Sequence, residues 1–146
     1  MENNTFKKEV KTEELETQKY MSDEVGEIVQ AIARATLEMP IPEKSKRGNR
    51  GAYSDLEDYL KCCKKTLAKH GIIIHQHPRY LKAGRIMFSM LLHTSGQWLL
   101  ASDLVNPDPK TIESAQAFQH AVSSVFTYAK RRMLQSQLGL GCDEEE

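Results

Sequence analysis

The sequence predicts an α+β domain with two N-terminal helices, an antiparallel meander of about three strands and a long C-terminal helix. Three observations lead to this fold class. Apolar residues recur at helical spacing in the first half of the chain, β-branched runs separated by glycine turns follow over residues 72–102, and a helical pattern resumes after residue 110. A chain of 146 residues is long enough to bury one core.

The expected domain boundaries follow the distribution of apolar and charged residues. Residues 1–21 contain few apolar side chains and are expected to form a mobile arm. Residues 22–140 are expected to form the folded domain, and residues 141–146 an acidic tip. The net charge of the whole chain is zero, but residues 25–140 hold 16 bases against 9 acids. This excess attracts polyanions, although an ordinary solvated surface explains the charge alone equally well.

The first helix is expected between Ser22 and Pro40. Ser22 is a suitable N-cap, and two acids follow it where the helix dipole favours negative charge. Apolar residues then recur at helical spacing, and the residue before a proline disfavours helical backbone angles. The predicted apolar stripe consists of Val25, Ile28, Val29, Ile32 and Ala35.

Residues 40–53 are expected to form a basic loop, because two prolines and two glycines interrupt every periodic pattern. Cations on a glycine-containing backbone can follow a nucleic-acid strand and release its counterions. Tyr53, at the end of the loop, is a candidate for stacking on an unpaired base. A basic surface loop that binds nothing specific is the alternative. The cations of the loop are Lys44, Lys46, Arg47 and Arg50.

The second helix is expected to begin with a capping box in which Ser54 is the N-cap and Glu57 its partner. Gly71 is placed to end this helix. The predicted buried stripe consists of Leu56, Leu60, Cys63 and Leu67. Extended runs over residues 72–76, 85–93 and 98–102 are then rich in β-branched and apolar residues, and short glycine-containing turns separate them. They predict three antiparallel strands.

The last helix is expected over residues 111–138, as one helix or as two with a bend near His120. Phe118, Val122, Val125 and Ala129 share the side predicted to face the sheet. Ser124, Thr127, Tyr128, Arg131 and Gln135 share another side, whereas the consecutive cations Lys130, Arg131 and Arg132 point in different directions. Tyr128 has two interpretations of equal weight: a half-buried anchor for the helix, or part of a binding surface.

Catalytic chemistry is only weakly indicated. His75 and His77 lie on one face of a predicted strand, and His93 on the next strand is a possible third metal ligand, but no carboxylate or cysteine stands nearby in sequence. Neither Cys62 nor Cys63 has a base beside it, and no phosphate-binding loop of the Walker type occurs. The sequence therefore predicts no catalytic residue, no metal and no cofactor.

The compartment is expected to be reducing and the protein soluble. Three cysteines, two of them adjacent, fit no even disulfide framework. The first twenty residues are too charged for a signal peptide, and no apolar run approaches membrane-spanning length. We therefore expect a cytoplasmic protein without membrane contact.

Several short motifs, in order along residues 22–146, resemble the ERF (essential recombination function) family of single-strand annealing proteins, carried mainly by phages and prophages. The match lacks two family residues: Ser123 stands where the family has glycine, and Arg132 where it has tyrosine. The matching motifs are Tyr53-Ser54-Asp55-Leu56, His70-Gly71-Ile72 with Gln76, His93-Thr94-Ser95-Gly96, then Ser124, Thr127, Tyr128 and Arg131, and finally Leu138-Gly139 before the acidic run Asp143–Glu146.

The resemblance implies a non-enzymatic protein that binds single-stranded DNA and anneals complementary strands without ATP in homologous recombination. It also implies a homo-oligomeric ring or filament in the cytoplasm of a bacterial host, with a phage exonuclease or a host single-strand-binding protein as partner. Two alternatives remain: a passive single-strand-binding module, and a metal-dependent hydrolase. The expected DNA-binding residues are Lys44, Lys46, Arg47, Arg50, Tyr53, Thr127, Tyr128, Lys130, Arg131 and Arg132.

Overall fold

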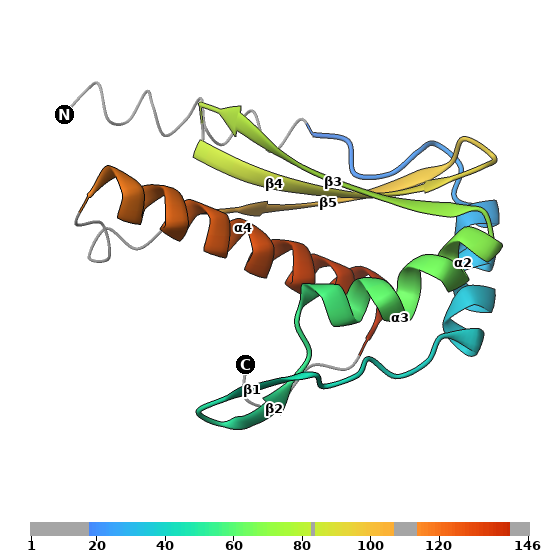
Figure 1. Ribbon diagram of the computed structural model, residues 1–146. Helices are drawn as coiled ribbons and strands as arrows, with labels where there is room; N and C mark the ends of the chain where they lie inside the picture. The colour runs from blue at the N-terminus through green and yellow to red at the C-terminus, as the bar shows by residue number, and fades with distance from the viewer. Residues whose placement is uncertain (1–17, 83, 107–113, 141–146) are drawn as a thin grey trace.

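The computed structural model describes residues 18–82, 84–106 and 114–140, and it has the α+β architecture that the sequence predicts (Figure 1). A three-stranded sheet carries helices on one face, and a separate two-stranded hairpin lies on the far side of those helices. Among the described helices, none combines the length and apolar character that crossing a bilayer requires. The elements are α2 (Gly26–Glu38), β1 (Lys46–Gly48), β2 (Gly51–Tyr53), α3 (Leu56–Lys69), β3 (Ile72–Leu81), β4 (Gly84–His93), β5 (Trp98–Leu104) and α4 (Ala115–Leu138).

The main sheet is the antiparallel meander expected from the sequence, with the strand order β3-β4-β5. β3 is longer than its apolar pattern indicates, since it continues to Leu81 instead of ending near Gln76. The register pairs Ile74 with Leu91 and Leu91 with Leu99. Directly paired residues point to the same side of a sheet, so these three side chains share one face. That face meets the helices.

The chain that precedes α2 runs along the outer edge of β5. Met21 forms a bridge with Leu99, and the Ser22 N–H donates to the carbonyl of Trp98 at 3.0 Å. The last residues of the predicted arm are therefore bound to the sheet. Residues 1–17 of that arm lie outside the described residues, as does the acidic tip 141–146.

The predicted N-cap of the first helix is wrong. The Ser22 hydroxyl donates to the Glu24 carbonyl at 2.7 Å, and α2 begins later than predicted. Gln97, from the turn between β4 and β5, caps the helix instead. Its Oε1 accepts hydrogen bonds from the Glu27 N–H at 2.9 Å and the Ile28 N–H at 3.0 Å. These are two of the N–H groups at the start of a helix that have no acceptor within the helix.

The second helix is confirmed, but its capping box lies one residue later than predicted. Asp55 is the N-cap and accepts from the Asp58 N–H at 3.0 Å, while the Asp58 carboxylate accepts from the Asp55 N–H at 3.0 Å. The predicted pair of Ser54 and Glu57 is wrong because Ser54 is buried and its hydroxyl donates to the Glu43 carbonyl at 2.9 Å. An aspartate pair satisfies the same two amides.

The loop predicted over residues 40–53 contains a short hairpin. β1 and β2 are antiparallel, with Arg47 opposite Ala52 and Gly48 opposite Gly51. Only two residues separate the paired glycines, and Gly51 has a φ of 116°, which glycine adopts without the strain that a Cβ atom brings. Two of the cations predicted for a flexible loop, Lys46 and Arg47, therefore lie on a paired strand.

The core lies between the sheet and the helices. Ala129 and Met133 of α4 pack against Met87 and Val105 in one cluster. The larger cluster joins α2, α3, the sheet and the end of α4, and its buried members are Ile28, Ala31, Ala35, Cys63, Leu67, Ile72, Leu91, Leu134 and Leu138.

Buried polar side chains fix the rotation of α4 on the sheet. Ser89 is fully buried; its Oγ donates to Gln137 Oε1 at 2.7 Å and accepts from Gln76 Nε2 at 3.1 Å. On the α3 side, Gln135 Nε2 donates to the Tyr59 hydroxyl at 2.6 Å. Leaving such groups unpaired costs about 1–3 kcal/mol each, so these contacts determine which face of α4 turns outward.

Candidate nucleic-acid interface

The hairpin presents its cations to solvent. β1 carries two of them, the turn a third, and a fourth precedes β1. Tyr53 ends β2 half-buried, and its ring packs beside Gly48, where an added Cβ would lie 3.3 Å from Tyr53 Cε1. The exposed cations are Lys44, Lys46, Arg47 and Arg50.

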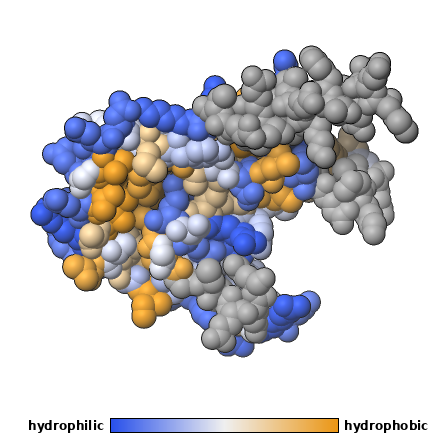
Figure 2. All heavy atoms as spheres, turned by 180° about the vertical axis from the view of Figure 1, so that it is seen from behind, coloured by the Kyte–Doolittle hydropathy of each residue, from blue (hydrophilic) through white to orange (hydrophobic). Residues whose placement is uncertain are grey.

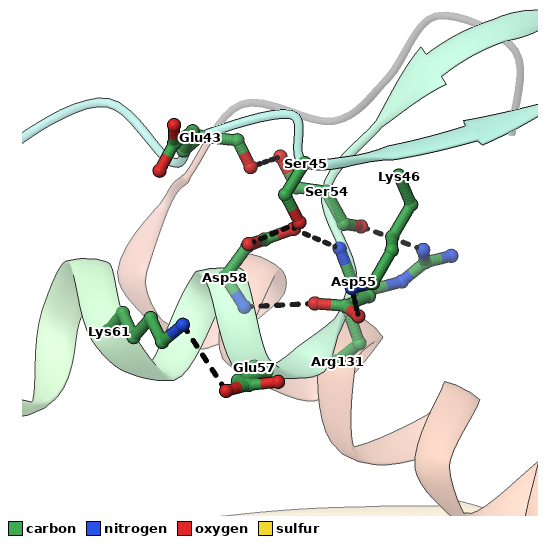
Figure 3. A network of polar contacts seen from close by, with 9 residues as sticks. All are labelled: Glu43, Ser45, Lys46, Ser54, Asp55, Glu57, Asp58, Lys61 and Arg131. Atoms are coloured by element: carbon green, nitrogen blue, oxygen red, sulfur yellow. Dashed lines mark hydrogen bonds and ion pairs between the residues drawn. The ribbon is translucent and has the colours of Figure 1, made fainter.

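Polar contacts connect the hairpin to the start of α3, and we call the residues Ser45, Ser54, Asp55 and Asp58 the hairpin base (Figure 3). Ser45 Oγ lies 2.7 Å from both carboxylate oxygens of Asp58 and donates to that carboxylate. This hydrogen bond is the main reason why the pKa of Asp58 is lowered; burial opposes it, and hydrogen bonds from the backbone N–H groups of Asp55 and Ser45 add to the lowering. Lys46 Nζ lies 3.8 Å from Asp55 Oδ2, so a cation offsets the second carboxylate.

Arg131 of α4 reaches the hairpin base from the other side (Figure 3). Its Nη1 donates to the backbone carbonyl of Ser54 at 3.0 Å. Its guanidinium carbon also lies 5.1 Å from the centre of the Tyr128 ring, within the range of a cation–π contact. Arg131 therefore joins the hairpin to α4 and at the same time forms part of the surface beside Tyr128.

Tyr128 is bracketed by two arginines on the outer face of α4. Arg132 lies 5.6 Å from the ring centre, and its Nη1 donates to the Tyr128 hydroxyl at 3.3 Å. Tyr128 remains 44% exposed. Beside it lies a cavity of about 380 Å³ between α4 and the start of α3, lined by Asp55, Leu56, Ser123, Ser124, Thr127, Tyr128 and Arg131.

The structure brings together some of the predicted DNA-binding residues. Thr127, Tyr128 and Arg131 share the cavity, and Lys46 of the hairpin lies 3.8 Å from Asp55, which also lines it. The Thr127 hydroxyl donates to the Ser123 carbonyl of its own helix at 3.0 Å. Lys130 does not line this cavity. It lines a neighbouring space of about 330 Å³, the α3–β3 groove, with Leu56, Leu60, Lys64, Ala68, Ile72, Ile73, Ile74 and Gln76, and Leu56 lines both spaces.

The histidines do not converge on a metal site. His75 and His77 share one face of β3, with ring centres 4.9 Å apart. His93 pairs with Ile72, and the alternation of side chains along β3 places Ile72, and so His93, on the opposite face. Among the described residues no group of three metal-ligating side chains occurs. Burial, and then the charges of His75 and Arg79, lower the pKa of His77.

The two described cysteines are buried and free. Cys62 Sγ donates to the Pro40 carbonyl at 2.7 Å. Burial raises the pKa of both thiols, that of Cys63 to about 11. A thiol with a raised pKa is a poor nucleophile. Both side chains are packed in the interior of the domain. Cys142 lies outside the described residues.

The residues that hold the hairpin in place were not predicted from the sequence. Asp58 could have been found, because it follows Asp55 at the spacing of a capping box. Ser45 could not, because the residue that it binds is 13 positions away. Gln135 was expected on the polar side of the last helix with Tyr128, but it is buried against Tyr59.

A comparison with family models identifies the evolutionary group of the chain. The ERF superfamily model matches residues 28–146, a range that includes the hairpin, α3, the main sheet and α4. Comparisons with curated proteins and with solved structures gave no match. On the strength of the family match over most of its length, the chain belongs to the ERF superfamily.

Proposed function

We propose that this protein binds single-stranded DNA across the hairpin and the adjoining face of α4, and that it anneals complementary strands without ATP. Membership of the ERF superfamily supports a role in recombination by strand annealing. The observation that carries the proposal is the position of Tyr128, an accessible ring between two guanidinium groups, next to a hairpin with exposed cations.

The chemistry of the surface suits a strand held by its phosphates. Lysine and arginine side chains neutralise phosphates and release counterions, and an aromatic ring stacks on a base of any identity. A strand held in this way keeps its base edges free to test a complementary strand. If each subunit neutralises about three phosphates, log affinity falls by about two per decade of salt. Lys130 lines the α3–β3 groove, which shares Leu56 with the cavity beside Tyr128, and its contact with the strand stays a prediction.

The proposal extends to assembly and partners. Several subunits in a ring or filament would hold a longer stretch of strand, and the salt dependence would grow with each engaged subunit. The expected setting is the cytoplasm of a bacterium that carries the phage or prophage, where an exonuclease would supply the single strands or a host single-strand-binding protein would cover them.

Replacing Tyr128 tests the surface directly. In Tyr128→Ala, the loss of stacking is expected to weaken binding by about 1–3 kcal/mol per stacked base. Tyr80→Ala is the matched control, because Tyr80 is also exposed but lies on β3. Fluorescence anisotropy with a labelled single-stranded oligonucleotide at low salt measures the affinity. Equal affinities of the two folded variants would remove Tyr128 from the interface.

An annealing assay separates the two binding hypotheses. Purified protein mixed with complementary labelled strands, without ATP, is expected to accelerate pairing. If the protein binds oligonucleotides but leaves the pairing rate unchanged, it is a passive binding module. If it binds no single strand at low salt, the proposal fails.

A further inference from the structure

The cavity beside Tyr128, which we call the Tyr128 cavity, carries groups suited to the edge of a base as well as to its face. Its volume of about 380 Å³ is at the small end of the range in which proteins hold small ligands. Leu56 and the ring of Tyr128 offer apolar contact to the face of a base. The other five lining residues have side chains that form hydrogen bonds, namely Asp55, Ser123, Ser124, Thr127 and Arg131.

Asp55 contributes an anionic acceptor to the cavity. Its Oδ1 accepts the Asp58 N–H at 3.0 Å as the cap of α3. Its Oδ2 lies 3.8 Å from Lys46 Nζ, which is close enough for an ion pair but too far for a hydrogen bond. Each oxygen of an ionised carboxylate accepts about two hydrogen bonds, so Oδ2 can accept one from a ligand. Figure 3 shows this carboxylate beside the side chain of Arg131, which lines the same cavity.

Hydroxyl groups of α4 line the cavity opposite the start of α3. Ser123 and Ser124 are exposed, and their hydroxyls have no hydrogen-bond partner among the described residues. The Thr127 hydroxyl donates to the Ser123 carbonyl at 3.0 Å and can still accept. A hydroxyl both donates and accepts, whereas an ionised carboxylate only accepts. Asp55 is therefore the group on which a choice between bases depends.

An acceptor at this position distinguishes bases by their edges. Adenine, cytosine and guanine each have an exocyclic amino group, and a carboxylate accepts a hydrogen bond from such a group, as in the contact of Asp or Glu with cytosine N4. Thymine and uracil have a carbonyl oxygen where cytosine has its amino group, and a carboxylate repels that oxygen. Contacts to phosphates carry no such information.

Apolar surface elsewhere on the molecule lacks this capacity. The most exposed large apolar side chains, Leu37 and Ile41, lie at the end of α2 and just after it, and Figure 2 shows apolar surface in the half of the molecule that contains α2. Stacking and apolar contact tolerate every base, because each base has a similar face. The combination of an apolar wall and a carboxylate is found in the Tyr128 cavity.

We propose that the Tyr128 cavity holds one base of the bound strand and selects bases that carry an exocyclic amino group, with Asp55 Oδ2 as the acceptor. This inference rests on the proposed function, since the strand lies across the hairpin and α4, and it adds a base preference to that function. The other bases of the strand keep their edges free for pairing. The preference is about tenfold, as expected for one hydrogen bond to a charged group at a partly exposed site.

Oligonucleotides of deoxycytidine and of deoxyuridine test the preference with little change in shape. In a homopolymer every register places the same base at the cavity. Fluorescence anisotropy with short labelled strands, at mildly alkaline pH where cytosine strands do not fold on themselves, measures both affinities at one salt concentration. The wild type is expected to bind the deoxycytidine strand about tenfold more tightly. Equal dissociation constants would overturn the inference.

Asp55→Asn exchanges the acceptor for a donor. Asparagine is as good an N-cap as aspartate, so its oxygen should keep the Asp58 N–H while its amide N–H groups replace Oδ2. The preference for deoxycytidine should disappear or reverse, because an amide N–H donates to the uracil oxygen. Asp103→Asn is the matched control: it removes the same charge at an exposed position of β5 outside the cavity, and it should keep the wild-type ratio of affinities.

A second measurement needs no variant. Strands of deoxyadenosine should bind the wild type more tightly than strands of purine deoxyriboside, which lacks the amino group of adenine. Equal binding of these two strands would also refute selection by the amino group. Circular dichroism checks that both aspartate variants are folded. An unchanged ratio in folded Asp55→Asn, or the same loss of preference in Asp103→Asn, would overturn the role of Asp55.

Failure of this inference is distinguishable from failure of the proposed function. If strands of deoxycytidine and deoxyuridine bind with equal and measurable affinity, the base preference is refuted and single-strand binding stands. If no single strand binds at low salt, the proposed function is refuted and the base preference with it.

Discussion

The helix-covered sheet and the hairpin are stabilised in different ways. In the first, side chains such as Leu67, Leu91 and Leu134 are fully buried, and burying each contributes about 1.5–3 kcal/mol. In the hairpin, all of β1 and the first two residues of β2 are exposed, and polar contacts at the hairpin base connect it to α3 and α4. Stability and strand binding should therefore respond to substitutions in different regions.

The largest effect on stability is expected in the core. Leu134→Ala removes a fully buried side chain and should lower the free energy of unfolding by about 2–5 kcal/mol. Leu104→Ala, at an exposed position of β5, should change it by less than about 0.5 kcal/mol. Urea unfolding followed by circular dichroism measures both. Equal decreases in the two variants would contradict the placement of Leu134 in the core.

An intermediate effect is expected at the hairpin base. Asp58→Ala leaves the Ser45 hydroxyl and the Asp55 N–H without their acceptor and should cost about 1–2 kcal/mol. Glu57→Ala is the matched control, since it removes an exposed ion pair with Lys61 at 3.2 Å, which solvent screens strongly, and should therefore cost less than Asp58→Ala. Urea midpoints that coincide for the two variants would contradict the anchoring role of Asp58.

Acid pH should weaken the same contact. Because the folded pKa of Asp58 is lowered, chiefly by the Ser45 hydrogen bond, its contribution to stability is present above the unfolded pKa of about 3.9 and is lost as the pH falls through the folded value. Asp58→Asn cannot titrate, so its stability should vary less with pH than that of the wild type below about pH 4. Parallel pH profiles would argue against this assignment.

The smallest effect on stability, and a clear effect on binding, is expected at the tip of the hairpin. Arg47→Ala with Arg50→Ala changes exposed side chains and should alter the free energy of unfolding by less than about 0.5 kcal/mol per site. The salt dependence of oligonucleotide affinity should become shallower by about 0.7 for each phosphate that the variant no longer neutralises. Lys65→Ala, on exposed α3 surface, should leave that slope unchanged. A double variant that melts early would mean that the hairpin cations support the fold.

Much of the fold was predictable because its signals are local. The β-branched run of β3, the glycine turns and the apolar stripe of α3 all lie within short stretches of sequence, and Gly71, with a φ of 76°, ends α3 as expected. The start of α2 was not predictable, because its capping group on Gln97 is 70 positions away. The hairpin was missed because glycines and cations in its strands resemble a loop.

The candidate site was predictable to the extent that helix geometry determines it. Residues three and four apart on the last helix do share one cavity, as with Thr127, Tyr128 and Arg131. The contact between Arg131 and Ser54 joins residues 77 positions apart, so no local sequence pattern predicts it. The residues around Lys130 could not be predicted from the sequence either, because they depend on how α4 is rotated against α3 and β3.

The glutamine cap on α2 has a consequence for how the domain opens locally. Gln97 fixes where α2 starts relative to the end of the sheet, so the first turn of the helix and the turn between β4 and β5 depend on one side chain. Without the Gln97 amide oxygen, two helix N–H groups would lose their acceptor at the same time. A single turn residue, remote from Tyr128 and the hairpin, therefore couples the opening of this helix to that of the sheet.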